Sequence, residues 1–417
     1  MPFRFLHAAD LHLDTPFEGL TALHPNLGAR LREASLQALD ALATAAIEHD
    51  VDFVVLAGDL YDGAERGLRA QLRMRAFTER LAAHRSAERD GGIRTLLVHG
   101  NHDPVDEGWS SITAWPPEVH VFAADRVEAI ALDLRGQPVT VYGTSYPRRD
   151  VRESLVPRYP RPTTPGFHLA ILHANVGSVT GHAAYSPCTI EDLAAVGMDY
   201  WALGHIHRGA VLRERGPRIV YPGNLQGRSF KPSERGAKGA VLVTVTGDRI
   251  DSRTLDLAPV RFEEVELDVS RSLDLADVVA QLHGSAELLR CPGRQLLARA
   301  RLVGATELWE DLVRPGSDTD LLADLRAQAP ADLWWADLRV DARPLVDFDA
   351  WRGRDGLRGE LVAVADELRL RSDDIRRVLG LEPPTAELVR DLDDAAVLEL
   401  LDRAVREAAV RLASDEA

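Results

Sequence analysis

Short apolar runs alternate with helical patterns from residue 1 to about residue 260. Glycines and prolines separate the runs, a rhythm typical of strands alternating with helices in an α/β fold. A helix is predicted over residues 27–49, between the first two strands, so these two strands should lie parallel. The predicted strands cover residues 3–9, 51–57, 93–98, 119–122, 139–142, 168–172, 200–203, 219–221, 240–245 and 250–255.

The pattern changes after residue 260. A small α+β module is predicted, with strands over 262–269, 295–303 and 333–340 and helices over 275–289 and 319–328. The chain then becomes helical and acidic, with apolar residues at helical spacing in 357–370 and 395–412. We therefore expect three regions, at residues 1–260, 261–345 and 346–417, in keeping with the usual domain size.

Charge is unevenly distributed along the 417 residues. The net charge of -16 argues against a nucleic-acid binder when taken alone, because phosphate backbones attract Lys and Arg. Residues 201–250, however, hold 9 Lys and Arg against 3 Asp and Glu, whereas residues 301–417 hold 16 against 27. A basic segment therefore remains available for a polyanionic ligand.

Cysteine content and hydropathy bear on the compartment. The 2 cysteines, Cys188 and Cys291, are too few for a disulfide framework and lack metal-binding spacing. The N-terminal residues do not have the pattern of a signal peptide, and no apolar run reaches membrane-spanning length. These observations predict a cytoplasmic protein without a membrane segment.

Polar motifs stand directly after five of the predicted strands. They are Asp10-Leu11-His12, Gly58-Asp59, Gly100-Asn101-His102-Asp103, His173 and Gly204-His205-Ile206-His207. Carboxyl ends of strands in an α/β sheet lie along one edge, where ligands bind, so the five motifs should converge. We expect the glycines to permit sharp turns off the strands. We also expect each pair spaced like Asp10 and His12 to share one face of an extended segment.

The chemistry of these residues predicts a metal centre. Imidazoles, carboxylates and an amide oxygen, with no thiolate, suit a borderline-hard divalent cation. Their number exceeds what one ion needs and suits two ions that share a bridging carboxylate. Manganese fits such a mixed set with open positions better than magnesium does.

The motif set resembles the signature of calcineurin-like metallophosphoesterases over about residues 1–260. Residues 5–14, 56–62 and 222–228 are similar to the bacterial DNA repair exonucleases of the SbcD and YhaO type, a branch related to the double-strand-break nuclease that works with a coiled-coil ATPase. The resemblance implies a four-layer α/β metallophosphoesterase β-sandwich flanked by helices, with a small α+β cap domain and a helical C-terminal tail. It implies a two-metal phosphodiesterase acting on DNA, in which metal-activated hydroxide attacks phosphorus.

The resemblance also implies residue roles. One metal ion would be held by Asp10, His12, Asp59 and His207, and the other by Asp59, Asn101, His173 and His205, with Asp59 bridging. His102 would stabilise or protonate the leaving oxygen, and Asp103 would orient it. Some relatives carry a second histidine three positions after the bridging aspartate, where this chain has Asp62. A two-histidine arrangement is therefore not expected.

Two further features concern partners. The basic residues Arg228, Lys231, Arg235 and Lys238 follow the last metal motif and would contact DNA, with a solvated loop as the alternative. Adjacent Trp334 and Trp335 face opposite sides of a strand, one in the core and the other packed on a helix or exposed for base stacking; packing is favoured.

The apolar residues of the tail recur along one helical face and must be buried on their own domain, on a second copy in a homodimer, or on a partner. They are Leu392, Val397, Leu398, Leu401 and Val405. The sequence has no nucleotide-binding Gly-Lys-Ser/Thr loop, so an ATP-driven step would need a partner such as an SbcC-like coiled-coil ATPase. The alternatives are a phosphatase or cyclic-nucleotide phosphodiesterase and a non-catalytic adaptor.

Overall fold

The computed structural model describes residues 2–15, 25–62, 68–87, 89, 91–107, 114–177, 185–370, 375 and 394–414. Two compact units make up the chain, the first from residues 1–263 with 290–297 and the second from residues 264–289 with 298–417. No helix in the described ranges is long and apolar enough to cross a bilayer.

The first unit contains a six-stranded sheet in the order β12-β11-β1-β2-β3-β4. β1 pairs with β2, β2 with β3 and β3 with β4 in parallel, whereas β11 runs antiparallel to β1. The parallel pairing of the first two strands confirms the expectation from the intervening helix. The strands are β1 (Phe3–Ala8), β2 (Phe53–Ala57), β3 (Arg94–Val98), β4 (Val119–Val121), β11 (Gly239–Thr246) and β12 (Arg249–Asp256).

A second six-stranded sheet of the same unit has the order β5-β6-β7-β8-β10-β9. Its central strands β6, β7, β8 and β10 are parallel, and β5 and β9 close its edges in antiparallel pairs. The strands are β5 (Glu128–Leu134), β6 (Gln137–Gly143), β7 (Phe167–His173), β8 (Tyr200–Gly204), β9 (Ala210–Arg213) and β10 (Arg218–Tyr221). Edge strands β5 and β9 were not predicted, because their exposed positions interrupt the apolar runs.

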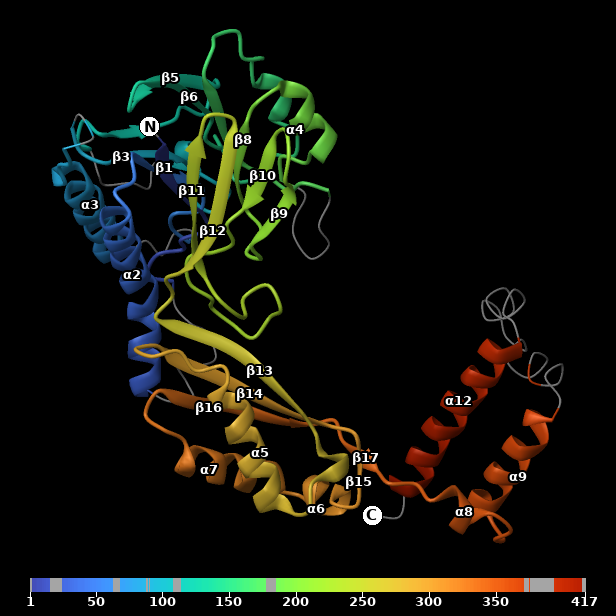
Figure 1. Ribbon diagram of the computed structural model, residues 1–417. Coiled ribbons are helices and arrows are strands. Elements are labelled where there is room, and N and C mark those ends of the chain that lie inside the picture. Colours follow the sequence, from blue (N-terminus) through green and yellow to red (C-terminus); the bar gives the residue numbers. More distant parts are fainter. Residues whose placement is uncertain are drawn as a thin grey trace. The chain divides into compact units, whose positions relative to one another are not determined.

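The two sheets pack face to face, with helices on their outer faces (Figure 1). Phe5 and Phe53 from the first sheet and Ile171 from the second share the central core. Alternate residues of the first sheet, such as Leu6 and Leu56, pack under the helices instead. This four-layer α/β sandwich confirms the predicted fold class. Its helices and short turns are α2 (Pro25–Glu48), α3 (Leu68–Ala83), α4 (Ile190–Val196), η1 (Val105–Glu107) and η2 (Val156–Arg158).

A three-stranded sheet, in the order β13-β14-β16, follows along the chain. Trp335 is fully buried, and the guanidinium carbon of Arg326 on α7 lies 4.9 Å from the centre of the Trp334 ring. The packing alternative for both tryptophans therefore agrees with the structure. The elements are β13 (Val260–Asp268), η3 (Val269–Arg271), α5 (Leu275–Glu287), β14 (Gln295–Val303), β15 (Ala305–Thr306), α6 (Trp309–Val313), α7 (Ser317–Gln328), β16 (Leu333–Val340) and β17 (Arg343–Pro344).

The tail forms α8 (Phe348–Trp351), α9 (Leu357–Arg369) and α12 (Asp394–Ser414), and α9 and α12 lie side by side (Figure 1). Val397, Leu401 and Val405 of α12 are buried against Ala365 of α9. The predicted apolar stripe is therefore covered within its own unit, which is the first of the three alternatives; Leu392 lies outside the described residues. A partner would therefore have to contact other residues of the tail.

Candidate functional site

The polar motifs lie at the carboxyl ends of β1, β2, β3, β7 and β8. The first three strands are neighbours in one sheet and the last two are neighbours in the other, so the five ends meet at one edge of the sandwich. A connected set of contacts at this edge joins the predicted ligands Asp10, His12, Asp59, Asn101, His173, His205 and His207.

Asp10, His12 and His207 form the first group of potential ligands. Their nearest ligand atoms all lie within 4.8 Å of one another. His12 Nε2 and His207 Nε2 face each other at 3.2 Å, and His207 Nε2 is 3.9 Å from Asp10 Oδ1. Asp59 Oδ2 lies 3.9 Å from His12 Nε2. A cation could accept lone pairs from all four side chains.

His173, Asn101 and His205 form the second group. His173 Nε2 lies 3.1 Å from Asn101 Oδ1 and 3.4 Å from Asp59 Oδ2, and the rings of His173 and His205 are 5.3 Å apart. The same Asp59 oxygen thus faces both groups. This is the geometry that a bridging carboxylate needs.

The hydrogen bonding of His173 tests whether a cation fits this site. Its Nδ1 lies 2.9 Å from Ala57 O, and a carbonyl can only accept, so Nδ1 carries a hydrogen. Nε2 then points at two oxygen acceptors, which requires a positive charge between them or on the ring. Burial would lower the pKa of His173, but the Asp59 carboxylate outweighs burial and raises this pKa to about 9. The residues therefore fit a divalent cation, which would supply that charge.

Asp10 is also adapted to a cation. It is fully buried, and burial raises the pKa of its carboxyl to about 6. His205 N donates to both of its oxygens, at 3.1 and 3.0 Å. Its salt-bridge partner in the described chain is a histidine rather than Lys or Arg. The carboxylate is thus held in place with much of its charge uncompensated.

The backbone at the ligands adopts a conformation that non-glycine residues rarely take. The φ angles are 52° at Asp10, 41° at His12, 52° at Asp59 and 98° at His205. Such residues each cost on the order of 1–3 kcal/mol and cluster at functional sites. Because the Asp10 segment is not extended, strand alternation does not explain how Asp10 and His12 converge, and that expectation is wrong.

The motif glycines are required mainly for close packing. Gly58 has a positive φ of 93°, whereas Gly100 and Gly204 do not. A Cβ atom on Gly100 would lie 2.2 Å from Asp59 Oδ1, and one on Gly204 would lie 1.9 Å from Ala57 O. A side chain at either position would displace a candidate ligand or the strand beside it.

His102 stands beside the ligands with a more open side chain. Its Nδ1 lies 2.5 Å from Asp62 Oδ1, and its side chain is 41% exposed. Burial would lower the pKa of His102, but the Asp62 hydrogen bond and the charges of Asp59 and Asp62 raise it above the usual histidine value. Asp62 in turn accepts a 2.8 Å bond from Arg228 Nη1. This arrangement favours a protonated imidazole facing the open edge.

Asp103 does not orient His102 as expected. Its two carboxylate oxygens accept hydrogen bonds from Gly100 N at 2.6 Å and Leu60 N at 2.7 Å. Asp103 therefore fixes the loops that carry Asp59 and Asn101, and Asp62 occupies the place that we assigned to Asp103. The sequence signal for Asp62 was its position three residues after Asp59.

The four predicted DNA-contacting residues have different surroundings. Lys231 is exposed, Arg235 is half-buried, and Arg228 is half-buried against Asp62. Lys238 is only 5% exposed, and its Nζ donates to His207 O at 2.6 Å and to Ser233 O. The assignment of Lys238 to DNA contact is wrong, because its charge is committed to backbone carbonyls inside the protein.

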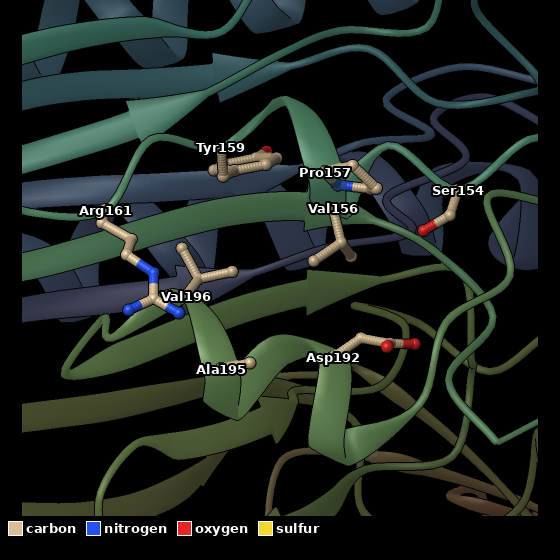
Figure 2. A pocket seen from close by; sticks show the side chains of 8 residues that line it. All are labelled: Ser154, Val156, Pro157, Tyr159, Arg161, Asp192, Ala195 and Val196. Atoms are coloured by element: carbon tan, nitrogen blue, oxygen red, sulfur yellow. The ribbon is translucent and has the colours of Figure 1, made fainter.

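A separate pocket of about 320 Å³ lies between η2 and α4 in the first unit (Figure 2). Tyr159, Arg161 and Asp192 are among its lining residues, and Tyr159 Oη donates to Ile171 O. None of the candidate metal ligands lines it. This pocket is therefore distinct from the site at the carboxyl edge.

Comparison with known proteins places the site in a family. The calcineurin-like phosphoesterase family matches residues 3–209, a range that includes all seven candidate ligands. The chain is 36% identical to the uncharacterized metallophosphoesterase YhaO of Bacillus subtilis over 325 residues, covering 78% of this chain and 77% of that protein.

More distant relatives are also similar. The DNA double-strand break repair protein Mre11 of Haloferax volcanii is 28% identical, with 68% of this chain and 62% of that protein covered. The SbcD component of the SbcCD nuclease of Bacillus subtilis is 26% identical, with 58% and 66% covered. The chain belongs to the calcineurin-like metallophosphoesterase family, because it matches both the family and YhaO.

Proposed function

We propose that this protein is a two-metal phosphodiesterase that hydrolyses DNA, as an exonuclease in DNA repair. The observation that carries this proposal is the convergence of two ligand groups on one oxygen of Asp59, next to the more exposed His102. Asp10, His12, Asp59 and His207 would hold one ion, and Asp59, Asn101, His173 and His205 the other. Manganese is the ion that we propose, since the donor set is mixed.

The metal ions would lower the pKa of a bound water and neutralise charge on the phosphate. The remaining steps belong to the chain. His102, held by Asp62, would donate a hydrogen bond to a phosphate oxygen and then a proton to the leaving oxygen. His102 N also donates to Asp59 Oδ1 at 2.9 Å, so the backbone of His102 is held against the proposed bridging carboxylate.

DNA as the substrate class rests on two supports. Relatives that are 28% and 26% identical bear the names of a DNA double-strand break repair protein and a nuclease component. Lys231 and Arg235 lie in the segment that begins soon after His207, where they would contact the phosphate backbone flanking the scissile bond. Arg228 would act closer to the site, beside Asp62.

A coiled-coil ATPase of the SbcC type is the partner that we propose for the tail. The apolar residues where α9 and α12 pack together are buried, so a partner would contact the outer surfaces of these two helices. Leu357, Val364 and Leu400 are 69%, 54% and 37% exposed on that surface. They are the residues to mutate in a binding assay with such an ATPase.

The test of the proposed function uses purified protein with Mn²⁺, linear duplex DNA, single-stranded DNA and a small phosphodiester. We expect metal-dependent shortening of linear DNA that weakens steeply with salt. Hydrolysis of the small ester with no action on DNA would contradict the DNA assignment. That result would favour a phosphatase or cyclic-nucleotide phosphodiesterase.

A further inference from the structure

Glu234 is a buried carboxylate that contacts a candidate metal ligand and the basic segment at once. Its side chain is 8% exposed, and Oε1 lies 2.6 Å from His207 Nδ1. Oε2 accepts hydrogen bonds from Asn224 Nδ2 at 2.8 Å and from Arg228 N at 3.0 Å. One carboxylate therefore accepts three contacts, one from the candidate ligand His207 and two from the segment that contains Asn224 and Arg228.

The contact with His207 determines which ring nitrogen is free. A carboxylate can only accept, so His207 Nδ1 carries a hydrogen, and in the neutral ring Nε2 then keeps its lone pair. Nε2 is the atom that faces His12 and Asp10. Carboxylates that accept from the far nitrogen of a metal-bound histidine orient the ring in this way.

The contacts in the other direction fasten the segment from Asn224 to Lys238. Asn224 pairs with Ala9, next to Asp10, in an isolated β-bridge. Lys238 closes the other end of the segment by donating to His207 O. Between these ends, Arg228 reaches Asp62, which holds His102. The segment is thus attached to the ligands at both ends and to the catalytic histidine in the middle.

We propose that Glu234 is a positioning residue that presents His207 Nε2 to a metal ion and, through the same carboxylate, fixes the segment carrying Arg228, Lys231 and Arg235. The inference rests on the proposed two-metal centre. Metal binding and the placement of the segment from Asn224 to Lys238 would then be coupled through Glu234, a residue outside the five polar motifs.

Glu234→Gln tests this role because glutamine has the same shape but only one acceptor oxygen. If the amide nitrogen faces His207, Nδ1 must accept, and the hydrogen moves to Nε2, where it blocks metal binding. If the amide nitrogen faces Asn224 and Arg228 N, donors oppose donors and the segment loosens. Either orientation removes part of the proposed function of the carboxylate.

Glu128→Gln is the matched control. Glu128 also accepts from a histidine ring, at 3.1 Å from His120 Nε2, and from a backbone amide, at 2.9 Å from Ala123 N. Neither partner belongs to the candidate metal centre. The control therefore reproduces the chemical change in the same unit without touching a ligand.

The measurements are Mn²⁺ affinity by calorimetry, hydrogen exchange of residues 224–238, and turnover of a small phosphodiester against Mn²⁺ concentration. For Glu234→Gln we expect Mn²⁺ affinity to fall by about 10- to 100-fold, exchange in the segment to rise, and turnover to recover at high Mn²⁺. For Glu128→Gln we expect wild-type values. Wild-type Mn²⁺ affinity together with wild-type exchange of residues 224–238 in Glu234→Gln would overturn the proposal.

Asn224→Ala keeps the proposal testable if Glu234→Gln does not fold. It removes the two Nδ2 contacts, to Gln226 O and Glu234 Oε2, and leaves the contact between Glu234 and His207. Exchange should therefore rise while Mn²⁺ affinity stays at the wild-type level. A loss of Mn²⁺ affinity in Asn224→Ala would overturn the proposal, since affinity would then depend on packing rather than on His207. A wild-type protein that binds no Mn²⁺ would instead refute the proposed function.

Discussion

Charged side chains are used differently at the carboxyl edge of the first unit and on the sheet of the second unit. At the edge, the described salt-bridge partners of Asp10 and Asp59 are histidines. On the β13-β14-β16 sheet, two arginines pair with carboxylates: Arg299 lies 2.6 Å from Asp337, and Arg301 lies 2.6 Å from Asp341 and 3.0 Å from Glu266.

The backbone differs in the same way. All described non-glycine residues with positive φ lie in the first unit, and Asp10, His12, Asp59 and His205 are among them. Strain and uncompensated charge occur together where a cation from outside the chain would stabilise both. On the β13-β14-β16 sheet, Arg299 and Arg301 are instead neutralised by carboxylates of the same unit. Carboxylates whose described salt-bridge partners are histidines rather than Lys or Arg, and not charge density, indicate the functional region.

The largest expected effect is that of Asp59→Asn at the edge. Asp59 Oδ2 faces both ligand groups, so both ions would lose a ligand. We expect loss of bound metal and a fall in turnover of about 10³-fold or more, corresponding to several kcal/mol of metal-ion catalysis. Asp337→Asn, the same change in the second unit, should leave turnover intact. Normal metal content and turnover in Asp59→Asn would show that the Asp59 carboxylate does not bind a cation at this edge.

His102→Ala should separate catalysis from metal binding. We expect wild-type metal content with turnover reduced by about 10²- to 10⁴-fold, the range for a positioned proton donor. The loss should be larger for a phosphodiester with a poor leaving group than for a nitrophenyl ester, because only the former needs the proton. A parallel fall in metal content would mean that His102 is itself a ligand, consistent with its closeness to His12 and Asp62.

Replacing Lys231 and Arg235 together with Ser should weaken DNA binding and leave small-ester turnover unchanged. Each lost phosphate contact lowers the slope of log affinity against log salt by about 0.9. Arg249→Ser with Arg253→Ser is the matched control, since both residues are exposed on β12 and the change in net charge is the same. Equal slopes of log affinity against log salt in the two double variants would mean that Lys231 and Arg235 belong to a solvated loop and do not contact DNA.

Arg299→Gln should have the smallest effect. The Arg299–Asp337 pair lies on the sheet surface, where such pairs contribute up to about 1 kcal/mol to the free energy of unfolding. We expect a small shift in denaturant midpoint and unchanged Mn²⁺ binding. A change in Mn²⁺ affinity would show that the candidate metal site depends on the β13-β14-β16 sheet, contrary to this account.

The sequence predicted most elements because buried strands read as uninterrupted apolar runs. The predicted bounds of β14 and β16 agree with the structure. Helix α3 was missed, since exposed Leu68 and Leu72 blur its apolar face. The positions of the metal motifs were predictable because each follows a strand whose carboxyl end must lie at the same edge.

What could not be predicted depends on contacts between distant segments. Asp103 is next to His102 in sequence, yet its carboxylate binds Leu60 N and Gly100 N. Asp62 and Glu234 reach their histidines from other loops; the position of Asp62 after Asp59 singled it out, but its contact with His102 and that of Glu234 with His207 join distant segments. Lys238 resembled its basic neighbours in sequence, and only its burial sets it apart.

Calorimetric titration of metal-free protein with Mn²⁺, with the metal content then measured by elemental analysis, determines whether Asp59 bridges two ions. Two ion positions sharing Asp59 predict two ions per chain, both lost in Asp59→Asn. Phosphodiester hydrolysis should disappear with a chelator and return with Mn²⁺. A protein that binds one ion or none, and still hydrolyses DNA in the presence of the chelator, would contradict the account.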